Sequence, residues 1–204
     1  MELINTFMTW ILKNRIGQIE KFKNNPLETQ REILFKLIHT AKHTEFGKKY
    51  NFGKISAYED YNAWVPVHDY EAIKPYIEQT MKGQQNVLWP TPIHWFSKSS
   101  GTTSSRSKFI PVSPESLEDC HFKGGKDMLS LYINNYPETK LFTGKSLTIG
   151  GSLQTNNLDF NENSFSGDIS AVITRNLPVW AQMARTPSLE VALMSEWEAK
   201  IEKM

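Results

Sequence analysis

The sequence contains a single cysteine, Cys120, so no disulfide can form within the chain. A lone thiol is typical of a protein that works in a reducing compartment, and we expect a cytoplasmic location. No apolar run approaches the roughly 18 residues of a membrane span. The start of the chain, Met1–Asn5, lacks the basic and apolar regions of a signal peptide. These absences predict a soluble intracellular protein without a membrane partner.

The sequence also lacks an excess of charge of either sign. Its 23 Lys and Arg residues against 22 Asp and Glu residues give a formal net charge of +1. Such a balance provides no general attraction to nucleic acid, so no nucleic-acid partner is expected. Hydrophobic residues make up 39% of the 204 residues, which is enough for a core in one large domain or a large part of one.

Two amphipathic segments open the chain. Apolar side chains recur at helical spacing over residues 3–23 and again over residues 27–41. An Asn-Asn-Pro turn at residues 24–26 separates them and supplies a cap and a proline for the first position of the second helix. We therefore expect a helical layer over residues 1–45, without obvious chemistry of its own.

Short apolar runs in the rest of the chain predict strands that alternate with helices. The expected strands lie near residues 93–97, 108–112, 146–149 and 169–174. A long polar loop is expected over residues 154–167. This alternation predicts an α/β protein.

Three further helices are expected. The first covers Asp69 to Lys82, where Pro75 must lie in the first turn or break the helix. The second starts at Ser113-Pro114, and the third runs from Pro187 to the end of the chain. The inner face of the second helix is expected to consist of Leu117, Cys120, Gly124, Met128 and Leu131. Cys120 is therefore predicted to be a core residue and not a nucleophile.

A loop rich in small and hydroxyl residues carries the clearest chemical signal. It joins two predicted strands and consists of Ser99, Ser100, Gly101, Thr102, Thr103, Ser104, Ser105, Arg106, Ser107 and Lys108. Small residues let the backbone approach a polyphosphate closely, and N–H groups and hydroxyls can donate to it. Lys108 adds a positive charge where the loop enters the next strand. Composition alone does not distinguish this loop from an exposed turn that binds no ligand. Its position between two predicted strands and its terminal lysine favour the interpretation as a phosphate loop.

The run Ser-Ser-Gly-Thr-Thr closed by a lysine resembles the phosphate loop of the adenylate-forming superfamily. Its spacing is similar to that of the auxin-responsive acyl acid–amido synthetase (Gretchen Hagen) family. The segments Thr44–Tyr50, Val65–Tyr70 and Asn86–Pro90 resemble the bacterial members of that family. Ser105 stands where the family pattern usually has a second glycine.

The resemblance implies the N-terminal portion of the large domain of an adenylate-forming enzyme, a mixed sheet flanked by helices with a helical N-terminal layer. It implies a ligase that activates a carboxylic acid with ATP and Mg²⁺ as an acyl-adenylate, then transfers the acyl group to an amino acid. Lys108 is the implied catalytic residue. Residues Ser99 to Ser105 are the implied nucleotide-binding residues, and no residue is implied as a metal ligand.

Two further segments are candidates for the pocket of the carboxylate substrate. Gly150-Gly151 and Thr174-Arg175-Asn176 both follow predicted strands, where α/β proteins place ligands. Gly151, Thr174 and Asn176 are the residues that we expect there. Ordinary turn chemistry explains the same residues, and Arg175 could pair with a carboxylate or lie on the surface.

The chain is interpreted as the N-terminal part of a larger adenylating domain, with residues 93–204 forming the portion around the nucleotide loop. The predicted last helix has no stop signal before Met204, so truncation is expected, with Trp197 and Ile201 exposed. The other motifs of the family lie beyond this chain, and the chain alone is expected to be inactive. A non-catalytic ligand-binding or interaction module is the alternative.

Overall fold

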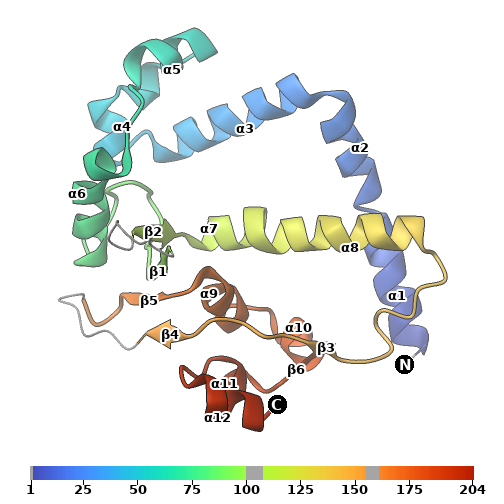
Figure 1. Cartoon of the computed structure of the whole chain (residues 1–204). Helices are drawn as coiled ribbons and strands as arrows, with labels where there is room; N and C mark the ends of the chain where they lie inside the picture. Colours follow the sequence, from blue (N-terminus) through green and yellow to red (C-terminus); the bar gives the residue numbers. More distant parts are fainter. Residues whose placement is uncertain (1, 100–107, 155–160) are drawn as a thin grey trace. The chain divides into compact units, whose positions relative to one another are not determined.

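The structure is a computed structural model, and it describes residues 2–99, 108–154 and 161–204 (Figure 1). The chain forms two compact units whose segments alternate along the sequence. The first unit comprises Met1–Pro26, Glu115–Leu153 and Ile169–Met204, and the second comprises Leu27–Pro114 and Gln154–Asp168. Both contain helices and strands, so the expected α/β class is confirmed.

Helices form most of the second unit. They are α3 (Pro26–Ala41), α4 (Glu45–Lys49), the 3₁₀ turn η1 (Phe52–Lys54), α5 (Tyr58–Trp64) and α6 (Tyr70–Met81). The predicted helix over residues 27–41 is thereby confirmed. Thr44 fixes the turn into α4, because its hydroxyl donates to Ala41 O at 2.7 Å and accepts from Gly47 N at 2.9 Å.

A four-stranded mixed sheet completes the second unit. Its order is β2 (Phe109–Val112), β1 (Trp95–Lys98), β5 (Phe165–Gly167) and β4 (Leu153–Gln154), the last lying where the chain enters this unit. β1 pairs antiparallel with β2, from Trp95 opposite Val112 to Lys98 opposite Phe109. It pairs parallel with β5 on its other side. The predicted mixed sheet is confirmed, but the polar loop expected over residues 154–167 contains a strand at its end.

The core of the second unit lies between α6 and β1. Ile77 and Met81 of α6 pack with Ile93 and Phe96, and all four are at most 6% exposed. Burying such side chains stabilises a fold by about 1.5–3 kcal/mol each, so this cluster fixes β1 against the helix.

Pro75 neither lies in the first turn of α6 nor breaks it, so that expectation is wrong. It is the sixth residue of the helix. Asp69 caps the N-terminus by accepting from Ala72 N at 2.9 Å, and Ile77, Thr80 and Met81 bury the face that follows the proline. The cap before the proline and the buried side chains after it offset the cost of the backbone hydrogen bond that the proline cannot make.

The first unit is built on one long helical segment. It runs through α7 (Pro114–Ser116), the π-helical turn η2 (Leu117–Phe122) and α8 (Lys123–Asn135). Two helices, α1 (Glu2–Lys13) and α2 (Ile16–Asn24), pack along α8. The single helix expected over residues 3–23 is therefore interrupted. At the interruption Arg15 forms a salt bridge with Asp127 of α8, and its Nη2 lies 3.1 Å from the carboxylate.

Most of the inner face predicted for the helix that starts at Ser113-Pro114 is wrong. Leu117 is buried as predicted, but Cys120 and Gly124 are exposed, and Met128 and Leu131 are 65% and 44% exposed. The residues that face inward from α8 are Ser130 and Ile133. The π-helical turn accommodates more residues per turn than an α-helix, which shifts the phase of every side chain after it.

The remaining elements of the first unit are short. They are β3 (Ser146–Leu147), α9 (Ile169–Arg175), α10 (Val179–Met183), β6 (Arg185–Thr186), α11 (Leu189–Ala192) and α12 (Trp197–Glu202). β3 and β6 pair in parallel.

Residues 169–174 form a helix and not the predicted strand. The β-branched run favours a strand by propensity, but packing decides here, because Ala171, Val172 and Thr174 are all buried on α9. The prediction of one continuous last helix is also wrong, since residues 193–196 separate α11 from α12. Trp197 and Ile201 are 54% and 64% exposed, as expected.

Candidate functional site

The base of the predicted phosphate loop is a β-hairpin. Strands β1 and β2 flank it, and two hydrogen bonds close it: Ser99 N donates to Lys108 O at 2.9 Å, and Lys108 N donates to Ser99 Oγ at 3.2 Å. Residues 100–107 lie outside the described residues, so the placement of Ser100 to Ser105 stays a prediction. The expectation that two strands flank the loop is confirmed at both ends.

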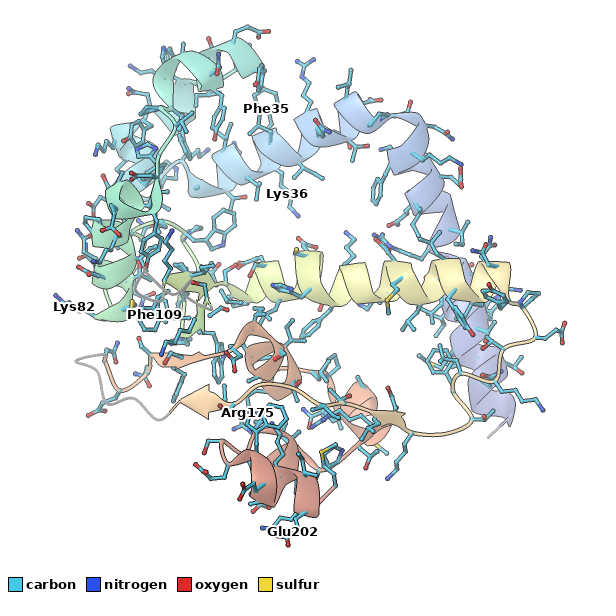
Figure 2. All side chains as sticks on the ribbon, viewed as in Figure 1. Phe35, Lys36, Lys82, Phe109, Arg175 and Glu202 are labelled. Carbon is cyan, nitrogen blue, oxygen red and sulfur yellow. The ribbon has the colours of Figure 1, made fainter. Side chains whose placement is uncertain are left out.

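Tyr70, the first residue of α6, holds the second strand at the foot of this loop. Its hydroxyl accepts from Phe109 N at 2.9 Å and donates to Phe109 O at 3.3 Å. Phe109, labelled in Figure 2, directly follows Lys108 and opens β2. One side chain thus satisfies both backbone polar groups of the residue next to the candidate catalytic lysine.

The ring of Tyr70 also contacts Lys108 itself. The Lys108 ammonium lies 5.2 Å from the centre of this ring, within the range of a cation–π interaction. Among the described residues, no carboxylate lies within salt-bridge distance of Lys108, and its side chain is exposed. An exposed ammonium that is oriented by a ring and not neutralised by an acid is available to bind an anion.

Gly151 follows the strand β3 as predicted, whereas Thr174 and Asn176 lie at the C-terminal end of the helix α9 and not at a strand end. Gly151 N donates to Ser170 Oγ at 2.9 Å in the first turn of α9. At the other end, Asn176 Nδ2 donates to Val172 O at 2.8 Å, and Thr174 is buried. The strand expectation fails because residues 169–174 are helical. All three residues belong to the first unit, whereas the hairpin belongs to the second.

Lys200 holds the turn that contains Gly151. It is 1% exposed, and its Nζ donates to Gly150 O at 2.7 Å. No sequence pattern singles out this lysine, because a lysine on a short amphipathic helix is normally exposed. Tyr70 ends the family-like segment Val65–Tyr70, but its contact with the hairpin depends on tertiary structure.

Arg185 is the other functional candidate that sequence reasoning did not identify. It is 7% exposed and lies in β6 opposite Ser146. Burial lowers the pKa of its guanidinium from the usual value, because the charged form loses its water. Arg175, the arginine that the sequence did point to, is exposed at the end of α9.

His94 lies just before β1. Its Nδ1 is 3.0 Å from Asn163 O, a contact that ties the starts of β1 and β5 together. In the part of the chain that the structure describes, no three His, Cys, Asp or Glu side chains gather as metal ligands. None of the helices among these residues has the length and apolarity that crossing a bilayer requires.

Comparison with known proteins matches residues 15–204 to one family model, the GH3 family N-terminal domain. Jasmonoyl--L-amino acid synthetase GH3.5 of Oryza sativa subsp. japonica is 30% identical over 104 residues, which cover 50% of this chain and 18% of that protein. Indole-3-acetic acid-amido synthetase GH3.2 of Arabidopsis thaliana is 30% identical over 101 residues, with coverage of 49% and 18%.

Two solved structures share the fold. GH3.15 acyl acid amido synthetase aligns with a TM-score of 0.71 and 19% identity, over 90% of this chain and 32% of that one. AtGH3.15 acyl acid amido synthetase in complex with 2,4-DB aligns with a TM-score of 0.72 and 20% identity, over 90% and 31%. This chain therefore spans 18% of the length of those curated relatives and about a third of the solved structures.

Proposed function

This chain belongs to the GH3 family, as its loop and flanking motifs predict, and we propose that it is part of an ATP-dependent ligase. The enzyme would join a small carboxylic acid to an amino acid through an amide bond. The names of the relatives support amide ligation, since they are synthetases that act on acyl acids and amino acids. The observation that carries the proposal is the hairpin with Lys108 at the base of a family-like loop.

The proposed reaction has two steps. A carboxylate oxygen of the acid attacks the α-phosphorus of ATP, and the bond from that phosphorus to the bridging oxygen breaks, which releases pyrophosphate. The amine of the amino acid then attacks the acyl carbon, loses a proton and displaces AMP. Negative charge builds on the pyrophosphate in the first step, and preorganised donors stabilise such charge most effectively.

Lys108 is assigned to that charge. Its ammonium is exposed, is oriented by Tyr70 and has no carboxylate partner among the described residues. The residues from Ser99 to Ser105 are proposed to donate hydroxyl and backbone N–H groups to the phosphates. Mg²⁺ is proposed as the ion that accompanies ATP. The described residues offer no cluster of acidic ligands for it, so we assign it no step.

Gly151, Thr174 and Asn176 are proposed as residues of the carboxylate pocket. The clearest support for this pocket comes from Gly151, because hydrogen bonds with Lys200 and Ser170 hold the Gly150–Gly151 turn in one conformation. The side-chain amide of Asn176 donates a hydrogen bond to Val172 O near the C-terminal end of α9. This leaves the side-chain oxygen of Asn176 available to accept from a ligand. A cytoplasmic location is also proposed, on the single cysteine.

Carboxylate-dependent exchange of pyrophosphate into ATP tests the proposal. The natural protein that contains this chain should catalyse exchange with at least one acid from a panel of indole-3-acetic acid, jasmonic acid and 2,4-DB, with amide formation followed by mass spectrometry. These acids are chosen because the names of the relatives and of a solved structure contain them. ATP binding without exchange or amide formation would favour the non-catalytic binding module instead.

A further inference from the structure

Among the described residues, two charged side chains are buried, Arg185 and Lys200. The Lys200 ammonium has partners, since it donates to Gly150 O at 2.7 Å and lies 4.9 Å from the centre of the Trp197 ring. The Arg185 guanidinium differs. Its Nε, Nη1 and Nη2 are all shielded from solvent, and none of them has a hydrogen-bond partner among the described residues. Arg185 is thus a buried cation whose charge the described residues leave uncompensated.

A guanidinium is costly to bury in this way. Arginine keeps its proton at neutral pH, so the group cannot escape the cost by becoming neutral. The lowered pKa of Arg185 has the same cause, loss of hydration. Arginines in protein interiors are normally paired with oxygen acceptors, because only these offset the lost water. Arg185 therefore needs an anionic partner that the described part of the chain does not supply.

We propose that Arg185 is an oxyanion-binding residue whose partner is the carboxylate or phosphoryl group of a small molecule. The planar guanidinium presents parallel N–H donors that match two oxygens of either group. Strand pairing places Arg185 opposite Ser146, and β3 leads into the Gly150–Gly151 turn that Lys200 holds. The oxyanion would therefore lie in the first unit, near the pairing of β3 and β6.

Because the guanidinium is shielded from solvent, a ligand can reach it only if a neighbouring element moves. α10 precedes β6 and has five residues, and α11 follows it and has four. Helices this short contain few backbone hydrogen bonds, so a local shift opens them at little cost in free energy. Under the proposal, binding to Arg185 would be accompanied by a small displacement of α10 or α11.

Thermal melting of the 204-residue chain in different anions tests the inference. Benzoate represents a carboxylate, inorganic phosphate represents a phosphoryl group, and chloride at matched ionic strength is the reference. The melting midpoint should rise saturably with benzoate or phosphate, by about 3–6 °C at ten times the dissociation constant. Whichever anion produces the rise identifies the source of the oxyanion.

Two variants assign the effect to one side chain. Arg185→Met keeps the aliphatic length and removes the charge, so it should lose the response and melt in chloride at or above the temperature of the unmodified chain. Lys203→Met is the matched control: Lys203 is a cation in the same unit but is exposed at the surface, and its variant should keep the full response.

Three results would overturn the proposal. The first is a midpoint of the unmodified chain that depends on ionic strength alone. The second is an equal response in Arg185→Met. The third is an Arg185→Met chain that melts lower in chloride or fails to fold, which would make Arg185 a structural residue. None of these results depends on the proposed ligase activity, because melting reports binding to this chain whether or not exchange occurs.

Discussion

Lys108 is the residue on which the proposed chemistry depends most directly. Replacing it with alanine removes a positive charge that acts on the leaving pyrophosphate. We expect carboxylate-dependent exchange by the natural protein to fall by about a hundredfold or more. The side chain is exposed and its ring contact is modest, so the free energy of unfolding should change by only about 0.5 kcal/mol.

Lys82 supplies a matched control for this prediction. It is an exposed lysine in the same unit, at the C-terminal end of α6 (Figure 2). Lys82→Ala should leave both exchange and melting unchanged. Normal exchange in a folded Lys108→Ala protein would remove Lys108 from the site, and a collapsed melting transition would make its role structural.

Tyr70 should act on the site through the hairpin. Tyr70→Phe keeps the ring beneath Lys108 but deletes the hydroxyl that serves both Phe109 N and Phe109 O. Leaving these backbone groups without that partner should cost about 1–2 kcal/mol of unfolding free energy. Amide hydrogen exchange at Phe109 should accelerate, which NMR or mass spectrometry can measure.

The exposed Tyr58 of α5 serves as the control, because Tyr58→Phe removes a hydroxyl from the same unit at a surface position. Its melting and exchange should match those of the unmodified protein. If Phe109 in the Tyr70→Phe variant exchanges at the original rate, then the hydroxyl does not hold the hairpin.

Asp60 carries a pH-dependent contribution to the start of α5. Its carboxylate accepts from Ser56 N at 2.9 Å, Ala57 N at 3.0 Å and Ser56 Oγ at 3.0 Å. The hydrogen bond from Ser56 N lowers the pKa of Asp60 most, followed by that from Ala57 N. A lowered folded pKa means that the stabilisation is present above the unfolded value near 3.9 and is lost as the pH falls through the folded value.

An NMR titration measures this directly. The carboxyl carbon of Asp60 should titrate at a lower pH in the folded chain than in a peptide of residues 55–64. Asp60→Asn should abolish the difference in stability of α5 between neutral and acidic solution. Equal pKa values in the chain and the peptide would show that the turn does not hold the carboxylate.

At the scale of elements, the turn from α3 into α4 tolerates no side chain at Gly47. A Cβ there would lie 2.1 Å from Ala41 O, far inside contact distance, and that oxygen belongs to the backbone. We expect Gly47→Ala to lower the unfolding free energy by about 2–4 kcal/mol, a fall of several degrees in melting temperature.

Gly53 in η1 provides the comparison within the same unit. A Cβ at Gly53 would meet nothing within 4 Å, so Gly53→Ala should be close to neutral or slightly stabilising. A pair of variants with equal melting temperatures would mean that the turn relaxes around the new methyl group.

The elements also show which parts of a fold a sequence reveals. The strands β1 and β2 were predictable, because two apolar runs enclose a loop of small residues, whereas their antiparallel pairing is known from the structure. α9 was not, since Val172 and its β-branched neighbours favour a strand until packing is considered. The phase of α8 was hidden as well, because η2 leaves no mark in the periodicity of apolar residues and moves Cys120 to the surface.

The candidate site was predictable to the extent that it depends on short motifs. Ser99 and Lys108 were identified because a phosphate loop is local in sequence, and the structure places both at the mouth of a hairpin. Tyr70, Lys200 and Arg185 depend on contacts between distant segments or on burial. No pattern within a window of sequence encodes that a lysine on α12 will reach Gly150 O.

At the scale of the whole molecule, the relation between chain length and activity gives the last prediction. The chain covers about a third of the solved structures that share its fold. The family resemblance assigns metal, adenine and amine contacts to motifs outside these residues. We therefore expect the 204-residue chain alone to catalyse no carboxylate-dependent exchange.

Because Lys108 and its hairpin are within the second unit, the chain should still bind pyrophosphate or ATP weakly, and Lys108→Ala should weaken that binding. Isothermal titration alongside the exchange assay separates the two properties. Exchange by the chain alone that disappears in Lys108→Ala would show instead that these residues already contain a complete site for the first step.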